Sequence, residues 1–160
     1  MMKTILCIGE ALIDFIPAQK GCALKDNAVF ERACGGAPAN VAAAAALLGA
    51  PAKMITQLGN DAFGDYITEV LKGAGVDTSC ILRTDKANTA LAFVALQEDG
   101  NRDFMFYRNP SADMLLESSQ IKDEWFSDCG ILHFCSVDLI DAPVKDAHLR
   151  AIALAKANGA

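Results

Sequence analysis

The chain has 160 residues, of which 52% are apolar and 21% charged; this balance excludes a disordered chain and predicts one folded domain. Its formal net charge of −6, without a lysine and arginine cluster, argues against nucleic acid and against an anionic membrane surface as partners. No window holds about 18 uncharged apolar residues, so no membrane-spanning helix is expected.

The six cysteines predict reduced thiols rather than disulfides or metal ligands. None forms a C-x-x-C pair, and only His133 and His148 could join them at a metal. Both histidines fit satisfied core or surface positions. Glu10 and Asp14 interrupt the apolar start of the chain and no small-residue cleavage site follows, which argues against a signal peptide. We therefore expect a cytoplasmic protein with no bound metal in this chain.

Short apolar runs alternate with helical patterns along most of the chain, which predicts a parallel sheet flanked by helices. Each predicted helix begins at a proline or a capping residue and all three end at glycine; Asp141 is expected to cap the last one, with Pro143 in its first turn. The predicted strands cover 3–9, 52–59, 80–84 and 130–137, and the predicted helices cover 38–48, 60–75 (capped by Asn60 or Asp61) and the segment that follows Asp141.

An antiparallel hairpin interrupts this alternation. Two strand-like runs surround Asp99-Gly100, a dipeptide typical of hairpin turns. A helix also closes at Gly159, where another strand would be expected, so we expect the first half of a longer fold. The predicted fold class is α/β, with a core formed by 1–16, 35–88 and 111–160 and a small antiparallel β layer formed by 17–34 and 89–110.

Several nucleotide and hydrolase motifs are missing. The sequence has no Gly-Lys pair, no G-x-G-x-x-G after the first predicted strand and no G-x-S-x-G. These absences argue against a P-loop, a dinucleotide-binding unit and a hydrolase nucleophile elbow.

The stretch CGGAPAN, at 34–40, lacks large side chains and is a candidate ligand cradle. Gly35 and Gly36 leave the backbone open to close approach, and Pro38 suits the first turn of a helix. The N–H groups at that helix start could face a ligand, and Asn40 offers a donor and an acceptor to a sugar hydroxyl. The alternative is a tight turn followed by an alanine helix packed closely on the sheet; this stretch alone does not decide between the two.

Asp14 adds a carboxylate a few residues after the first predicted strand. Ligands of parallel α/β sheets gather outside the carboxyl ends of the strands. A carboxylate at that place can accept hydrogen bonds from two neighbouring sugar hydroxyls. A solvated loop aspartate is the alternative interpretation.

Together these residues resemble the first signature of the ribokinase-like (PfkB) sugar kinases. The matching positions are Gly35, Gly36, Pro38, Asn40, Ala42, Gly49 and Gly59. The segments GEALID, with Asp14, and LGNDAFGD, at 58–65, are similar to the same family. TALAFVAL and FYRNPSADMLL, at 106–116, are most similar to its bacterial fructokinase branch. The resemblance covers nearly the whole chain.

The resemblance implies roles for particular residues. Asp14 would hydrogen-bond sugar hydroxyls, Gly35 and Gly36 would let the sugar approach the backbone, and Asn40 would hold it from the helix start. The β segments would form a lid that excludes water and serves as a homodimer contact.

Three lid residues are weaker candidates. Phe93 and Phe106 would form an apolar wall, and Arg108 would reach a sugar hydroxyl or a phosphate. Ordinary hairpin aromatics and a surface arginine are the alternatives.

The chain departs from the family in one large respect. The family's second signature ends in Gly-Ala-Gly-Asp and supplies the general base and an anion hole, but the nearest segment here, at 73–76, ends in Val76. No catalytic residue is therefore expected in this chain. ATP and Mg²⁺, with K⁺ as a further candidate ion, would bind mainly to a missing C-terminal half, and the chain alone is expected to be inactive.

The resemblance implies phosphorylation of fructose to fructose 6-phosphate. Kinases for ribose, tagatose, 2-keto-3-deoxygluconate or aminoimidazole riboside share much of the pattern, although Cys135-Ser136-Val137 stands where ribokinase-type members usually carry an acid. A non-catalytic sugar-binding or dimerisation module is a second alternative. A flavodoxin-like domain is a third, which the hairpin and the spaced signature disfavour.

Overall fold

The computed structural model describes residues 3–19, 21, 23–96 and 102–160. One of its two four-stranded sheets is fully parallel, with the strand order β5-β4-β1-β8. Its strands are β1 (Thr4–Ile8), β4 (Ala52–Gly59), β5 (Ile81–Thr84) and β8 (Cys129–Phe134). This confirms the expected parallel α/β core, although β8 ends three residues earlier than the sequence predicts.

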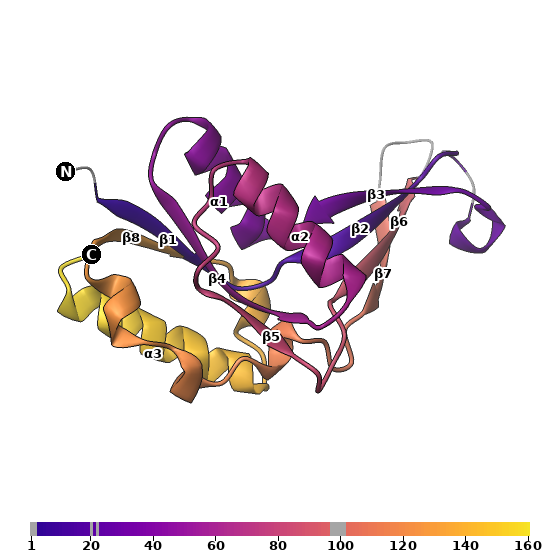
Figure 1. The fold of residues 1–160 in the computed structure, drawn as a ribbon. Helices are drawn as coiled ribbons and strands as arrows, with labels where there is room; N and C mark the ends of the chain where they lie inside the picture. The colour runs from indigo at the N-terminus through magenta and orange to yellow at the C-terminus, as the bar shows by residue number, and fades with distance from the viewer. Residues whose placement is uncertain (1–2, 20, 22, 97–101) are drawn as a thin grey trace.

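Helices cover both faces of this sheet (Figure 1). The helices α1 (Ala37–Leu47) and α2 (Ala62–Gly73) share one hydrophobic cluster with β1 and β4, and α3 (Pro143–Ala157) forms a second cluster on the opposite face. Alternate residues of β1 enter the two clusters: Cys7 joins the first, whereas Leu6 and Ile8 join the second. A strand buried on both faces needs apolar residues at successive positions, which explains the continuous apolar run.

The second sheet lies beside the core, to the right in Figure 1. Its order is β3-β2-β6-β7, built from β2 (Leu12–Pro17), β3 (Phe30–Gly35), β6 (Leu91–Leu96) and β7 (Arg102–Tyr107). The outer pairs are antiparallel, but β2 and β6 run parallel, so the sheet is mixed rather than antiparallel. We call this sheet the lid sheet. The expected turn at Asp99-Gly100 lies outside the described residues.

Two sequence-based boundaries were wrong. Residues 12–16, which the sequence assigned to the core, form most of β2 in the lid sheet. Asp141 does not cap α3: the N-cap is Ala142, which makes no side-chain cap bond, and Pro143 stands in the first turn as expected. A proline at that position already removes one unpaired N–H group, so the helix start depends less on a side-chain cap.

The connections contain short 3-10 helices, and two of them carry acids that matter below. They are η1 (Leu24–Asp26), η2 (Asp113–Leu115), η3 (Ser118–Gln120), η4 (Asp123–Phe126) and η5 (Ser136–Asp138). Cys7, Cys34, Cys80, Cys129 and Cys135 are free thiols, in line with the sequence. Within the described part of the chain, no helix combines the length and the apolar character needed to cross a membrane.

Candidate functional site

The structure brings Asp14 and Gly35 together. Asp14 lies in β2 opposite Ala33 of β3, and Gly35 ends β3. A Cβ atom added to Gly35 would overlap the Asp14 carboxylate. The carboxylate therefore lies directly against the bare backbone of Gly35, and Asp14 is a strand residue rather than a loop residue.

Gly36 is required by the path of the chain itself. Its φ of +100° lies in the region that favours glycine, and a Cβ atom there would stand 2.5 Å from the Glu10 carbonyl oxygen. The close approach of the β1–β2 connection thus accounts for this glycine through packing. The packing interpretation of the glycine pair is therefore confirmed, because Gly35 lies against Asp14 and Gly36 against Glu10; the ligand interpretation stays a prediction.

Asn40 lies in the first turn of α1 and is exposed. The N-cap of this helix, Gly36, has no side chain, and the Ala37 N–H donates to the Glu10 carboxylate. One of the N–H groups at the helix start is therefore already satisfied by an acid of this chain.

The register of the lid sheet separates the two predicted wall residues. Asp14 pairs with Ala92, and Ala92 pairs with Phe106, so these three side chains lie on one face. Phe106 is 54% exposed on that face. Phe93 lies on the opposite face, where its ring stacks on Phe15 with centroids 4.7 Å apart.

Phe93 therefore cannot share a wall with Phe106 and Asp14. Its aromatic neighbours connect the lid sheet to α2, since Phe15 makes an edge contact with Phe63 of that helix. The predicted apolar wall beside Asp14 is thus limited to Phe106 and to residues in its row, which we call the Asp14 face: Ala33, Asp14, Ala92 and Phe106.

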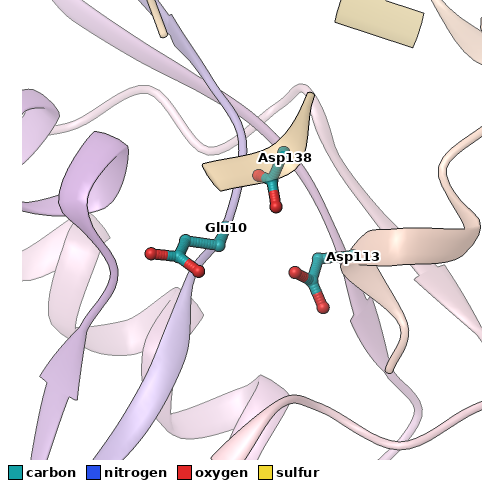
Figure 2. A group of neighbouring side chains, drawn as sticks. All are labelled: Glu10, Asp113 and Asp138. Atoms are coloured by element: carbon teal, nitrogen blue, oxygen red, sulfur yellow. The ribbon is translucent and has the colours of Figure 1, made fainter. Parts of the chain in front are cut away.

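Arg108, just past the end of β7, is buried in a cluster of acids. Its Nη1 atom lies 2.9 Å from Glu10 Oε2, and its Nη2 atom lies 2.8 Å from Asp138 Oδ1 and also contacts Asp113. Figure 2 shows the three carboxylates, which reach the same place from three separate segments. We call these four residues the Arg108 cluster. The surface arginine considered from the sequence is excluded, because the side chain is only 11% exposed.

Burial dominates the electrostatics of the cluster. It raises the pKa of Glu10 and of Asp138 above the ordinary carboxyl value, and the neighbouring acids add to both shifts while Arg108 opposes them. Burial alone would lower the pKa of Arg108, but Asp113 and the other acids raise it overall. The three carboxylates lie close enough together to hold a cation in principle, but the guanidinium group already bonds to all three.

Some polar atoms near the cluster lack partners in the part of the chain that the structure describes. They include Asp138 Oδ2, Arg108 Nε and His148 Nε2. His148 is fully buried, and its Nδ1 lies 2.8 Å from the Val144 carbonyl oxygen, which requires a donating Nδ1–H. Nε2 of a neutral His148 is then an acceptor. The expected core position of His148 is thus observed, but only Nδ1 of its ring has a hydrogen-bond partner among the described residues.

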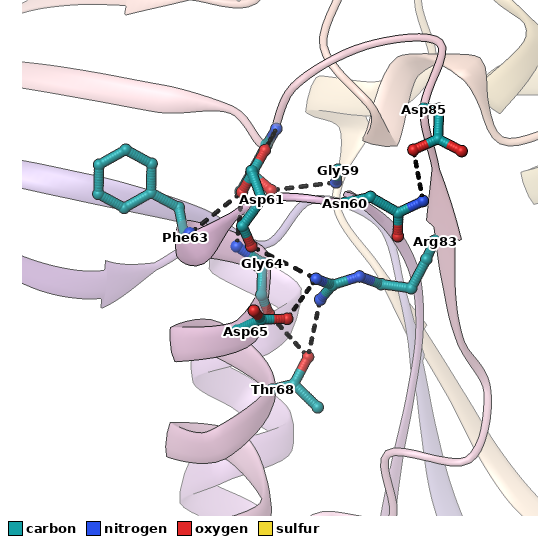
Figure 3. Close-up of polar contacts among 10 residues, drawn as sticks. Gly59, Asn60, Asp61, Phe63, Gly64, Asp65, Thr68, Arg83 and Asp85 are labelled. Carbon is teal, nitrogen blue, oxygen red and sulfur yellow. Dashed lines mark hydrogen bonds and ion pairs between the residues drawn. The ribbon is translucent and has the colours of Figure 1, made fainter.

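A second polar group surrounds Asp61 at the end of β4 (Figure 3). Asp61 Oδ1 accepts hydrogen bonds from the N–H groups of Phe63 at 3.1 Å and Gly64 at 2.8 Å, so Asp61 rather than Asn60 caps α2. Asp61 Oδ2 accepts a further bond from Thr89 N at 2.8 Å. Thr89 precedes β6, so this residue connects the core to the lid sheet.

Sequence reasoning missed Glu10, Asp113, Asp138 and the lid contact of Asp61. The residue after Cys135-Ser136-Val137, where ribokinase-type members usually carry an acid, is Asp138, which is fully buried against Arg108. A local signal existed, because Glu10 and Asp138 both follow strands of the parallel sheet, β1 and β8, at the same edge.

Known proteins match this chain in sequence and in fold. Residues 2–160 match the family model described as pfkB family carbohydrate kinase. Fructokinase-1 of Oryza sativa subsp. japonica is 46% identical over 158 residues, which are 99% of this chain and 49% of that protein. The chain spans about half the length of the curated relatives it matches.

Solved structures agree. Fructokinase from Xylella fastidiosa with bound ATP has a TM-score of 0.89 and 44% identity, covering 100% of this chain and 47% of that one. A putative Ribokinase II from E. coli, in complex with ATP and Mg²⁺, has a TM-score of 0.91 and 29% identity, covering 99% of this chain and 51% of that one. The match over nearly the whole sequence, together with the shared fold, shows that this chain belongs to the pfkB family of carbohydrate kinases.

Proposed function

We propose that this chain supplies the sugar-binding half of an ATP-dependent kinase that converts fructose to fructose 6-phosphate. The observation that carries the proposal is the contact between the Asp14 carboxylate and Gly35 at the carboxyl end of the parallel sheet. The fructokinase names of its relatives point to fructose as the sugar.

In this proposal Asp14 accepts hydrogen bonds from two sugar hydroxyls. Gly35 and Gly36 keep that side of the space free of side chains, and Asn40, exposed in the first turn of α1, contacts a further hydroxyl. Phe106 covers an apolar edge of the sugar from the same face of the lid sheet. Phe93 acts indirectly, by packing the opposite face onto α2.

Arg108 is a weaker candidate for sugar contact than the sequence implies. Nη2 bonds to two carboxylates and Nη1 to one, so among the described contacts only Nε and the second N–H of Nη1 could donate to a sugar hydroxyl. We propose that its main role is to fasten the end of β7 to the core.

The residues of this chain would bind and orient the sugar and shield it from water, so that phosphoryl transfer is favoured over hydrolysis. ATP, when bound, supplies the phosphoryl group, with Mg²⁺ neutralising its charge and K⁺ as a further candidate ion. We assign these groups and the general base to residues outside this chain, because Gly-Ala-Gly-Asp is absent and the Arg108 cluster already pairs its acids.

We also propose a homodimer through the lid sheet. Its outer strand, β7, exposes Phe104, Phe106 and Tyr107, and an open edge strand with exposed apolar side chains favours pairing with a second copy. A cytoplasmic location fits the free thiols.

The test is an ADP-release assay on the complete product of the gene that encodes these residues. We expect ADP with fructose and little with ribose, tagatose, 2-keto-3-deoxygluconate or aminoimidazole riboside. Release with another of these sugars alone would overturn the substrate but not the kinase. Sugar binding without ADP release from any of them would overturn the kinase and favour the binding or dimerisation module.

A further inference from the structure

We propose that Asp61 is a positioning residue for β6, the first strand of the hairpin formed by β6 and β7, which we call the lid hairpin. It holds β6 in the register that sets Ala92 beside Asp14. The role of this contact in sugar binding rests on the proposed function. The contact itself, the bond from Thr89 N to Asp61 Oδ2, is called the Asp61 anchor and can be tested without sugar or ATP. The proposal stands on a set of contacts in which one carboxylate serves the core and the lid through different oxygen atoms.

The first step is the hydrogen bonding of Thr89, which is only 3% exposed. Asp61 Oδ2 accepts from Thr89 N at 2.8 Å, and Thr89 Oγ1 accepts from Gly59 N at 3.0 Å. A Cβ atom on Gly59 would overlap Asp61 Oδ2 and lie 2.7 Å from Thr89 N. Gly59 therefore leaves the room that the Asp61–Thr89 contact occupies.

The second step is the path from Thr89 to the Asp14 face. The next residue, Ala90, accepts a hydrogen bond from Ile13 N at 3.1 Å through its carbonyl oxygen. The strand then pairs Leu91 with Ile13 and Ala92 with Asp14. Because a shift of one residue would turn every side chain of β6 to the opposite face, the point at which Thr89 is held sets which residue stands beside Asp14.

The third step is that capping and anchoring are separable. Oδ1 caps α2 through Phe63 and Gly64, whereas Oδ2 receives the Thr89 N–H. Asparagine caps helices about as well as aspartate does, but its NH₂ group cannot accept a hydrogen bond. Asp61→Asn therefore keeps the cap and removes the anchor.

The experiment is residue-resolved amide hydrogen exchange on the 160-residue chain. In Asp61→Asn we expect the exchange of Thr89 and of the β6 amides to accelerate about 10- to 100-fold, as for a lost bond to a charged group, with α2 unchanged. Asp77→Asn is the matched control, because Asp77 Oδ1 accepts from Ser79 N at 2.9 Å, away from the lid sheet. It should leave β6 exchange unchanged.

Two results would overturn the proposal: unchanged exchange at Thr89 in Asp61→Asn, or equal acceleration in β6 and α2, which would show that the residue is only a cap. If Asp61→Asn does not fold, Thr89→Val decides, because it removes the hydroxyl that accepts from Gly59 N and bonds to Asp61, while it keeps the Thr89 N–H. We expect faster β6 exchange in Thr89→Val as well, and no change there would also reject the anchor.

Kinetics of the complete gene product then separate this proposal from the proposed function. Asp61→Asn should raise KM for fructose more than it lowers kcat, since it displaces the sugar-binding row and not the reacting groups. If the unmodified enzyme phosphorylates no sugar while the exchange result holds, the proposed function fails and the anchor stands.

Discussion

The two ends of the lid hairpin are fastened to the core by opposite means. At the start of β6, the single carboxylate of Asp61 collects N–H groups from Thr89, Phe63 and Gly64. Past the end of β7, the single guanidinium of Arg108 collects three buried acids and leaves polar atoms without partners among the described residues. The first anchor depends on an acid that stays ionised, and the second depends on one cation that compensates an excess of negative charge.

The largest expected effect comes from removing that cation. Arg108→Met leaves three buried carboxylates uncompensated and should lower the free energy of unfolding by about 3–5 kcal/mol, measured by urea denaturation. Arg83→Met is the control and should cost about 1 kcal/mol or less, because the one ion pair of Arg83 among the described residues is with Asp65, whose side chain is 71% exposed, and its bonds to Thr68 Oγ1 and the Asp61 carbonyl oxygen are long, at 3.5 and 3.4 Å. Similar losses in the two variants would contradict the difference between the anchors.

The next effect tests the packing of the Asp61 anchor. Gly59→Ala places a methyl group between Asp61 and Thr89 and should destabilise the chain by about 1–3 kcal/mol, measured in the same way. Gly73→Ala, in the last turn of α2, meets no atom within 4 Å and should be neutral or stabilise by up to about 1 kcal/mol. An unchanged free energy of unfolding in Gly59→Ala would show that Asp61 and Thr89 are not packed tightly against Gly59.

A pH series should give the two anchors opposite signs. Partial burial alone would raise the pKa of Asp61, but its N–H donors lower it overall, so its stabilisation is present above the unfolded value of 3.8 and is lost as pH falls through the lower folded value. The raised pKa of Asp138 works the other way: stability decreases as pH rises through the folded value.

Urea denaturation at pH values below and above 3.8 should therefore show two separate losses of the free energy of unfolding. Asp61→Asn should flatten the loss of stability as pH falls below 3.8, and Asp138→Asn should flatten the loss as pH rises above 3.8. The same end of the profile responding to both substitutions would show that the two anchors do not differ in this way.

Local sequence patterns predicted the core well, because the apolar residues and helix-start residues of each element are enough to indicate a buried strand or a helix. The run at 3–9 and the proline at the start of α1 needed no distant information. The lid sheet was harder: Leu12–Pro17 follows β1 after three residues and carries no local sign that it belongs to another sheet. The opposite placement of Phe93 and Phe106 depends on a pairing register that composition does not encode.

The candidate site shows the same division. Asp14, Gly35 and Gly36 were identified from their own residue types and spacing, together with the family resemblance. The partners of Arg108 were not, because Glu10, Asp113 and Asp138 come from three segments that only the tertiary fold brings together.

The most direct test of the account is kcat/KM for fructose in the complete gene product carrying Asp14→Ala, beside Asp26→Ala, which removes an exposed acid of η1 between β2 and β3. Loss of two hydrogen bonds to a charged group predicts a decrease of about 100-fold or more for Asp14→Ala and none for Asp26→Ala. Equal values for the two variants would contradict the assignment of the Asp14 face to sugar binding.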